Sequence, residues 1–246
     1  MRITLLMVLG LTVGWAQSDP GEVLRQWLEE GRAAVQAGQF DAAIARFQKA
    51  LEAVDADSAA AGDLYLRIGE TQRRKGDLDG AIQSLAHAND LLPGNATVVG
   101  TLALALDSRG NRSDAQRAYR ATIELDPNNA IAMNNLAFLL AEEGTSFDEA
   151  LQLARHAMAL MPDSMQMTDT AGWVQLKRGD NDAAIALFSD AVAKEPAEDS
   201  FRDHLLMALE RKGERAGIFG ETISALKQAP SPENLAKVTS LLQGLK

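Results

Sequence analysis

The chain contains no cysteine among its 246 residues. Disulfide bonds, cysteine-ligated metal centres and a lipid-modified N-terminal cysteine are therefore excluded, so stability must come from packing. Aromatic residues make up only 5% of the chain, whereas hydrophobic residues make up 46%. Strands favour aromatic and β-branched residues, and closely packed helices favour alanine. This balance predicts helices around a substantial core.

Positive charge is also scarce, with 24 Lys and Arg against 34 Asp and Glu and a formal net charge of -10. Nucleic-acid affinity depends on basic residues that displace counterions from phosphates, so we expect no nucleic-acid partner. No basic run is long enough to hold the chain on an anionic membrane surface. The acidic excess mainly favours solubility.

Long apolar runs are rare, and the one that stands out, Ile3 to Val13, lies at the start of the chain. Met1-Arg2 precedes it with a positive charge, and Gly14-Trp15-Ala16 follows as a small-x-small cleavage pattern. This arrangement predicts a signal peptide over 1–16 and an exported protein, periplasmic or secreted. The alternative is an uncleaved anchor, but eleven helical residues reach only about 16 Å, well short of the ~30 Å hydrocarbon core. We therefore expect no stable membrane insertion after cleavage.

Proline is uncommon but regular. Five of the seven prolines are Pro93, Pro127, Pro162, Pro196 and Pro230, at intervals of 34, 35, 34 and 34 residues. A set of glycines keeps the same period, at Gly76, Gly110, Gly144, Gly179 and Gly213. Glycine commonly ends helices in the left-handed conformation, and proline lacks the N–H that a continuing helix needs. The pattern predicts helix pairs, with the glycine between the two helices and the proline after the second.

Small residues follow the turn glycines, Gly38 included, at two positions seven residues apart on one face of the second helix, except that Ile218 takes the first position after Gly213. The first position holds Ala43, Ala81, Ala115, Ala150 and Ala184, and the second holds Ala50, Ala88, Thr122, Ala157, Ala191 and Ala225. Larger side chains lie between them at Phe47, Leu85, Tyr119 and Phe188. We expect the small residues to let helices approach closely and the large ones to fill the remaining volume.

In these features the chain resembles the tetratricopeptide repeat family, whose unit is a 34-residue antiparallel helix pair. The resemblance implies an all-α, right-handed superhelical solenoid with five to six repeats. It covers 24–232, as units 24–57, 62–95, 96–129, 130–164 and 165–198 and a degenerate sixth at 199–232. Two departures, the extra Ser58 to Ala61 and a turn at Gly144 that is one residue longer, are expected to lie in loops. A C-terminal capping helix is predicted over 233–246, since the last repeat would otherwise expose its apolar face.

The resemblance also implies that the first helices of the pairs line a concave groove for a partner peptide or helix. One predicted column of that face reads Leu104, Phe138, Trp173 and Met207, bordered by Asn134, Asn135, Asp169 and Thr170, and by Thr101, Asp203 and His204. Aromatic and apolar contact area beside short polar groups suits peptide binding. The alternative is that Phe138 and Trp173 pack between adjacent helices as core.

Charged residues give no clear clamp for a partner carboxylate. Some members of the family bind one with basic residues on consecutive first helices, but here those helices carry Asp107, Glu142 and Asp169. Basic residues gather instead at the front, at Arg25, Arg32, Arg67, Arg73 and Arg74. They would either meet an acidic partner segment or form a solvated face.

No sequence motif indicates a catalytic activity. The chain has no phosphate-binding glycine loop, nucleophile elbow or metalloprotease motif, so we expect no enzyme, no cofactor and no metal. Gly76 to Gly80 resembles a calcium loop only superficially, and a methionine cluster (Met158, Met161, Met165 and Met167) is interpreted as core. The histidines, His87, His156 and His204, lack zinc-ligand spacing. The sequence thus predicts a protein–protein interaction scaffold of the cell envelope, without naming the partner or the oligomeric state. The alternative is a structural envelope protein that self-associates or associates with polysaccharide.

Overall fold

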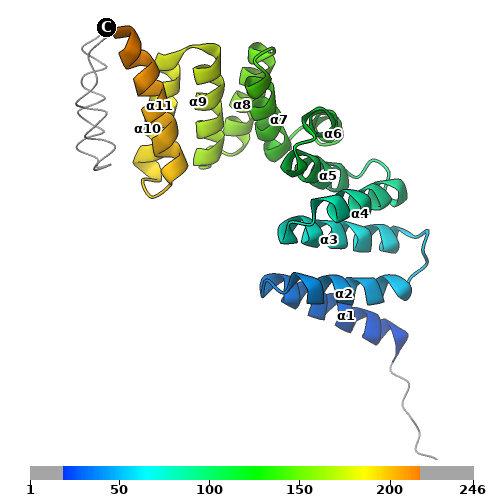
Figure 1. The fold of residues 1–246 in the computed structure, drawn as a ribbon. Helices are drawn as coiled ribbons and strands as arrows, with labels where there is room; N and C mark the ends of the chain where they lie inside the picture. Colours follow the sequence, from blue (N-terminus) through cyan, green and yellow to red (C-terminus); the bar gives the residue numbers. More distant parts are fainter. Residues whose placement is uncertain (1–18, 217–246) are drawn as a thin grey trace, which may run out of the picture.

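The computed structural model describes residues 19–216, which form eleven α-helices in sequential antiparallel pairs (Figure 1). The all-α solenoid prediction is confirmed. The helices are α1 (Pro20–Gln36), α2 (Phe40–Glu52), α3 (Ala59–Lys75), α4 (Leu78–Leu91), α5 (Ala96–Arg109), α6 (Arg112–Leu125), α7 (Ala130–Glu143), α8 (Phe147–Leu160), α9 (Met165–Arg178), α10 (Asn181–Lys194) and α11 (Asp199–Ala216). The predicted signal peptide, the later part of the sixth unit and the predicted capping helix lie outside the described residues.

The repeat glycines end the first helices and the repeat prolines lie between helix pairs, as predicted. Glycines at the ends of α3, α5, α7 and α9 have positive φ, for example 91° at Gly76 and 95° at Gly179, a conformation that costs other residues a Cβ clash. Pro93, Pro127, Pro162 and Pro196 lie in the loops between pairs. In the segment that resembles a calcium loop, the Asp77 carboxylate accepts a hydrogen bond from the Gly80 N–H at 3.1 Å and so caps α4. That segment is a helix–turn–helix connection.

Close approach within each pair depends on the small residues. All described members of the two predicted small-residue positions, from Ala43 to Ala191, are fully buried. Glycine faces the large residue of the second helix in three pairs. A Cβ at Gly31 would lie 2.4 Å from the Phe47 ring, and one at Gly172 would lie 2.7 Å from the Phe188 ring. These contacts are closer than van der Waals separation permits, so the glycine makes room for the ring.

The first of the two departures is not a loop. Ser58 caps α3 by accepting the Ala61 N–H at 3.2 Å, and Ala59 to Ala61 form the first turn of the helix, which therefore has 17 residues. Alanine is the best helix former, and with a capping serine before it the extra segment lengthens the helix. The extra residue at Gly144 does lie in a loop, between α7 and α8.

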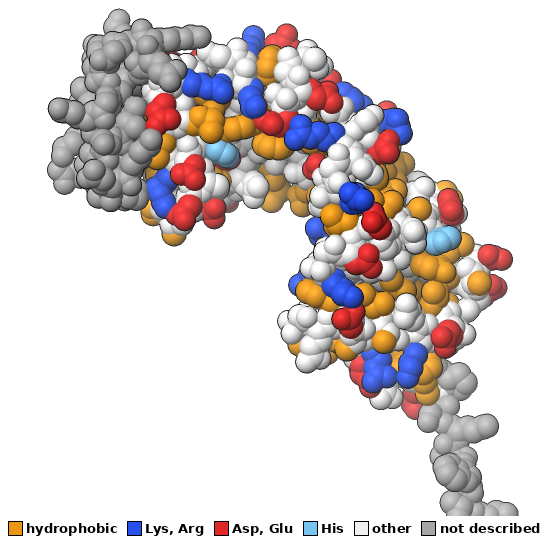
Figure 2. Space-filling model, in the orientation of Figure 1, with side chains coloured by type: hydrophobic (Ala, Val, Ile, Leu, Met, Phe, Trp, Pro, Cys, Tyr) orange, Lys and Arg blue, Asp and Glu red, His pale blue; other side chains and the backbone are white. Residues whose placement is uncertain are grey.

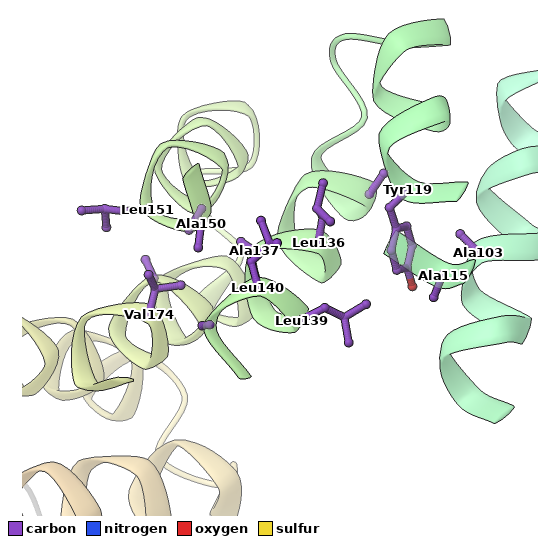
Figure 3. Close-up of a cluster of buried hydrophobic side chains, with 14 of the residues drawn as sticks. Ala103, Ala115, Tyr119, Leu136, Ala137, Leu139, Leu140, Ala150, Leu151 and Val174 are labelled. Carbon is purple, nitrogen blue, oxygen red and sulfur yellow. The ribbon is translucent and has the colours of Figure 1, made fainter. Parts of the chain in front are cut away.

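The core is a row of adjoining clusters and has no single centre, as expected when each pair contacts mainly its neighbours. The largest cluster joins α5 to α9 and contains Tyr119, Leu136, Leu140 and Val174 (Figure 3). Met165 and Met167 are buried in neighbouring clusters, as predicted. Met161 is 41% exposed, contrary to the prediction, because α8 ends at Leu160 and leaves Met161 in the following loop.

Exposed ion pairs join successive helix pairs at a recurring position. An Asp in the first turn of a second helix meets a cation near the end of the next first helix, in Asp41–Lys75 (2.5 Å), Asp79–Arg109 (2.8 Å), Asp148–Arg178 (3.5 Å) and Asp182–Lys212. Between α6 and α7 a Gln116–Glu143 hydrogen bond of 2.7 Å takes this place. Each Asp lies near a helix N-terminus and each cation near a helix C-terminus, where the helix dipole also stabilises the charge.

The stacked pairs form a curved solenoid, with α1 and α2 at one end and α10 and α11 at the other (Figure 1). Within residues 19–216, no helix combines the length and apolar character needed to cross a membrane. In the same range, no three His, Asp or Glu side chains come together as a metal-ligand set.

Candidate functional site

A groove of about 560 Å³ lies between α7, α9 and the start of α11, and we call it the C-terminal groove. Its lining consists of Asn134, Asn135 and Phe138 from α7; Ser164, Met165, Gln166, Asp169 and Thr170 from the start of α9; and Glu195, Glu198, Ser200, Phe201 and His204 from α11 and the loop before it. The side chains are mostly short and polar, around two aromatic rings. Such a surface offers both contact area and hydrogen-bonding groups to a ligand.

Aromatic rings from the three helices stack along the groove. Phe138 is 38% exposed, and its ring centroid lies 6.2 Å from that of Trp173 at an interplanar angle of 24°. The Trp173 ring lies in turn 4.6 Å from the ring of His204. Trp173 is half-buried and packs against the clusters on both sides, while Phe138 faces the groove. Phe138 is thus the exposed end of a row of rings fixed by the core.

The imidazole of His204 is held by Asp169. His204 Nδ1 lies 2.9 Å from each carboxylate oxygen of Asp169, which links α11 to α9 across the groove. The ring also contacts Phe188, at a centroid distance of 5.5 Å. The groove wall on this side is therefore fixed by both a polar and an aromatic contact.

Asn134 is buried without full hydrogen bonding. Its side chain is 5% exposed and lines the groove, and its Oδ1 has no hydrogen-bond partner. Most buried polar atoms have a partner, because an unsatisfied one costs about 1–3 kcal/mol. The Oδ1 atom is itself buried, at the edge of a groove that the rest of the side chain lines.

Two charged side chains, Glu142 and Lys177, hold the Trp173 ring in place. The Glu142 carboxylate accepts the Trp173 indole N–H at 2.9 Å and lies 2.7 Å from Lys177 Nζ. Lys177 Nζ also lies 5.1 Å from the Trp173 ring centroid, a cation–π contact. The hydrogen bond from Lys177 lowers the pKa of Glu142 below its ordinary value, against the opposing effect of burial. Glu142 therefore stays ionised and fixes the tryptophan.

In the neighbouring pair, Tyr119 and Asp107, burial is the largest cause of the pKa shifts. The Tyr119 hydroxyl donates a hydrogen bond to Asp107 Oδ2 at 3.3 Å. Burial raises the pKa of Tyr119, and the negative charge of Asp107 raises it further. Burial is also the main cause of a raised pKa at Asp107, which the hydrogen bond from Tyr119 opposes. This pair lies within the core between α5 and α6 and serves packing.

A second, smaller hollow of about 180 Å³ lies between α1, α2 and α3, and we call it the N-terminal hollow. Its charged lining is Arg32, Arg67, Arg74 and Glu70, beside the buried ring of Phe47. Of the five basic residues predicted at the front, the structure brings these three arginines together. Arg25 and Arg73 do not line the hollow. Figure 2 shows that acidic and basic side chains are interspersed over the displayed face, so no patch of one sign extends along it.

The sequence profile of the tetratricopeptide repeat family matches residues 28–96, and a second profile of the same family matches residues 72–137. These segments cover the helix pairs from α1 to α7. The chain is a tetratricopeptide repeat protein. Proteins of this class are generally non-catalytic scaffolds that bind other proteins.

Curated relatives extend the similarity toward the C-terminus. A TPR repeat-containing protein of Pseudomonas aeruginosa is 28% identical over 166 residues, which cover 67% of this chain and 28% of that protein. The cellulose synthase 2 operon protein C of Komagataeibacter xylinus is 31% identical over 214 residues, or 85% of this chain and 15% of that protein. This tetratricopeptide repeat chain therefore spans less than a third of either relative.

Solved structures share the fold. A tetratricopeptide repeat protein from Parabacteroides merdae superimposes with a TM-score of 0.71 at 18% identity, covering 87% of this chain and 83% of that one. A MamA protein gives a TM-score of 0.60 at 24% identity, covering 73% of this chain and 96% of that one. At these identities the comparison establishes the solenoid architecture alone.

Five of the eight predicted groove residues line the C-terminal groove of this tetratricopeptide solenoid: Asn134, Asn135, Phe138, Asp169 and Thr170. Trp173 supports the groove through its stacking on Phe138 and belongs partly to the core. Leu104 lies in a separate hollow of about 190 Å³ between α5 and α7. Met207 is 37% exposed but does not line the groove. The rotation between successive pairs divides the predicted continuous stripe into separate surfaces.

The structure adds groove residues to those eight. His204, predicted to border the column, lines the groove, and it shares the helix position of Asn135 and Thr170. Glu195 and Glu198 lie in the loop between α10 and α11, for which the helix register gives no signal. Phe201 is buried and reaches the groove from the first turn of α11.

Proposed function

We propose that this chain is a protein–protein interaction scaffold of the cell envelope that binds a peptide or helix of a partner protein in the C-terminal groove. The observation that carries the proposal is the exposed Phe138 ring in a groove whose other side chains are mostly polar. An anchored aromatic ring gives contact area without losing side-chain freedom, and the polar side chains around it can form hydrogen bonds with a ligand backbone. The general role of tetratricopeptide repeat proteins in binding other proteins supports it.

The binding step needs little rearrangement. The row Phe138, Trp173 and His204 is held by the core and by the Asp169 and Glu142 carboxylates, so the groove is formed before a partner arrives. A preformed surface reduces the entropic cost of association. The mechanism is therefore equilibrium binding on a rigid surface.

Photo-crosslinking in the native organism tests this assignment. A benzophenone amino acid is placed at Phe138 and, as a matched control, at Glu124 on α6, which lines none of the three hollows described above. We expect a crosslinked protein from position 138 that mass spectrometry identifies and that position 124 does not give. Phe138→Ala should weaken capture of that protein by about 1–2 kcal/mol, the range of a moderate hot spot. Equal capture by the Phe138→Ala variant and the native chain would remove the groove from the proposal.

Location in the envelope depends on the predicted signal peptide over 1–16. Its support is the charged start, the apolar run and the small-x-small pattern before Gln17. The mass of the chain purified from its native organism measures this directly. We expect a mature N-terminus at Gln17 in an envelope fraction, and a chain of full mass in the cytoplasm contradicts export.

A second candidate function is a structural envelope protein that self-associates or associates with polysaccharide. It is favoured by the similarity to two proteins named for cellulose synthase operons, from Komagataeibacter xylinus and Pseudomonas fluorescens. Light scattering over a concentration series measures self-association, and Trp173 fluorescence with added cellohexaose measures sugar binding at the aromatic row. A constant monomer mass and unchanged fluorescence would reject this candidate.

A further inference from the structure

The charges in the C-terminal groove are almost all negative. The charged side chains that line it are Asp169, Glu195 and Glu198, together with the imidazole of His204. Among the described residues of its lining, none is Lys or Arg. The N-terminal hollow has the opposite balance, with three arginines and one glutamate. The two ends of the solenoid thus offer different charge to a ligand.

The cations near the groove in the sequence are already paired. Arg202 donates hydrogen bonds to the Pro196 carbonyl oxygen at 2.6 Å and to the Asp199 carboxylate. Lys194, next to Glu195, lies 3.0 Å from Asp190, and Lys177 lies against the Glu142 carboxylate. Because these cations are neutralised by their own partners, they do not offset the carboxylates of the groove.

Asn134 gives an independent indication of ligand chemistry. The buried Oδ1 of this side chain is an acceptor without a partner, and the exposed oxygens of Glu195 and Glu198 around the same groove are acceptors too. A ligand that fits must therefore bring donors, and Lys and Arg side chains bring three and five N–H groups. A segment rich in Asp or Glu would bring further acceptors and be repelled.

The molecule already holds one cation by the chemistry that the groove offers. Lys177 lies between a carboxylate, Glu142, and an aromatic face, Trp173. The adjacent exposed ring, Phe138, lines the groove together with the exposed carboxylates of Glu195 and Glu198. An incoming ammonium or guanidinium group would find the same two kinds of partner there.

We propose that the C-terminal groove selects a protein segment bearing Lys or Arg, whose cationic groups bind its carboxylates and whose aliphatic stems cover Phe138. The proposal rests on the function proposed above, since it names the partner class of that same groove. The long stems of Lys and Arg suit an aromatic floor with an acidic wall.

Selection from a peptide library tests the charge preference. Random 12-residue peptides displayed on phage are selected against the purified full-length chain, and the ratio of Lys and Arg to Asp and Glu is compared with the input. We expect enrichment of the basic residues. Replacing Lys and Arg by Ala in a recovered peptide should weaken its binding about tenfold in fluorescence polarisation, from the combined loss of charge pairing and cation–π contact.

Two charge variants make the test specific. Glu195 and Glu198 are exposed, so E195K/E198K should fold and is expected to select acidic peptides, whereas E195Q/E198Q should lose the preference without reversing it. The matched control E52K/E124K makes the same change in net charge away from the groove and should keep the basic preference. Helical circular dichroism checks that each variant is folded.

Each remaining outcome separates this proposal from the one on which it rests. Peptides that lose binding with Phe138→Ala but show no charge preference overturn the cationic partner and leave the groove as a binding site. Recovery of no peptide that depends on Phe138 overturns both. Self-association that E195K/E198K abolishes would identify a second copy of the chain as occupant and overturn the cationic peptide.

Discussion

The N-terminal hollow and the C-terminal groove are formed by equivalent repeat units, but the side chains that line them carry opposite charge. Both are backed by a glycine packed against a phenylalanine, Gly31 with Phe47 and Gly172 with Phe188. The hollow is small and lined by arginines, while the groove is about three times larger, acidic and partly aromatic. Buried repeat positions are constrained by packing, whereas exposed positions on the first helices can vary. If the proposed binding sites are correct, we expect specificity to lie in exposed side chains that vary while the packed repeat positions do not.

The largest expected effect tests whether the two ends are independent. Phe188→Ala should lower the free energy of unfolding of the C-terminal pairs by about 3–5 kcal/mol, and Phe47→Ala should do the same at the N-terminal end. Trp173 and Trp27 report on these ends in urea unfolding, with the other tryptophans replaced by Phe. We expect each substitution to shift mainly the nearer probe, because each pair contacts mainly its neighbours. Equal shifts of both probes would mean one cooperative unit.

A smaller effect is expected from adding a methyl group at the close contacts. Gly31→Ala and Gly172→Ala should each destabilise by about 1–3 kcal/mol, because overpacking against the phenylalanine ring exceeds the gain in helix propensity. Gly100→Ala is the matched control, since its Cβ would meet only the Thr122 side chain, 3.2 Å from the methyl group and 3.6 Å from Oγ1. Its stability in urea should stay within about 0.5 kcal/mol of the native chain. Tolerance of alanine at Gly172 but not at Gly31 would show a looser C-terminal pair.

The third prediction concerns Glu142, which supports the aromatic row at the C-terminal end. Its pKa is lowered in the folded state, so the ionised carboxylate stabilises the fold above its ordinary value of 4.5. This stabilisation, about 1 kcal/mol, is lost as pH falls through the folded pKa. Glu142→Gln should therefore flatten the acid side of the pH–stability curve read by Trp173 fluorescence. Glu124→Gln is the control, and an unchanged curve in E142Q would show that the cluster does not depend on this charge.

The smallest effect is expected from the ion pairs between helix pairs. Removing Lys75 or Lys212 should each cost little stability, and less at high salt, because these pairs are partly or fully exposed. The two variants compare the same repeated contact at the two ends. Urea unfolding at low and high ionic strength measures both, and a larger, salt-independent loss at either end would mean that the side chain acts through packing.

Much of the candidate site was accessible from the sequence, because a 34-residue register places equivalent side chains at equivalent helix positions. Asn135, Thr170 and His204 follow from that register. Glu195 and Glu198 do not, since they lie in a connection where the helical period carries no information. The separation of Leu104 from Phe138 was also not predictable, because it depends on the rotation between successive pairs.

By itself the sequence determined the helix pairs and their order, through local rules that act over a few residues. Repeat glycines end helices, prolines separate pairs and small residues allow close contact, whatever the rest of the chain does. Only the tertiary structure decided which exposed side chains converge. It assigned Trp173 partly to the core and Phe138 to the surface, and brought the α10–α11 loop to the groove. Those outcomes depend on how neighbouring pairs stack, which no short segment specifies alone.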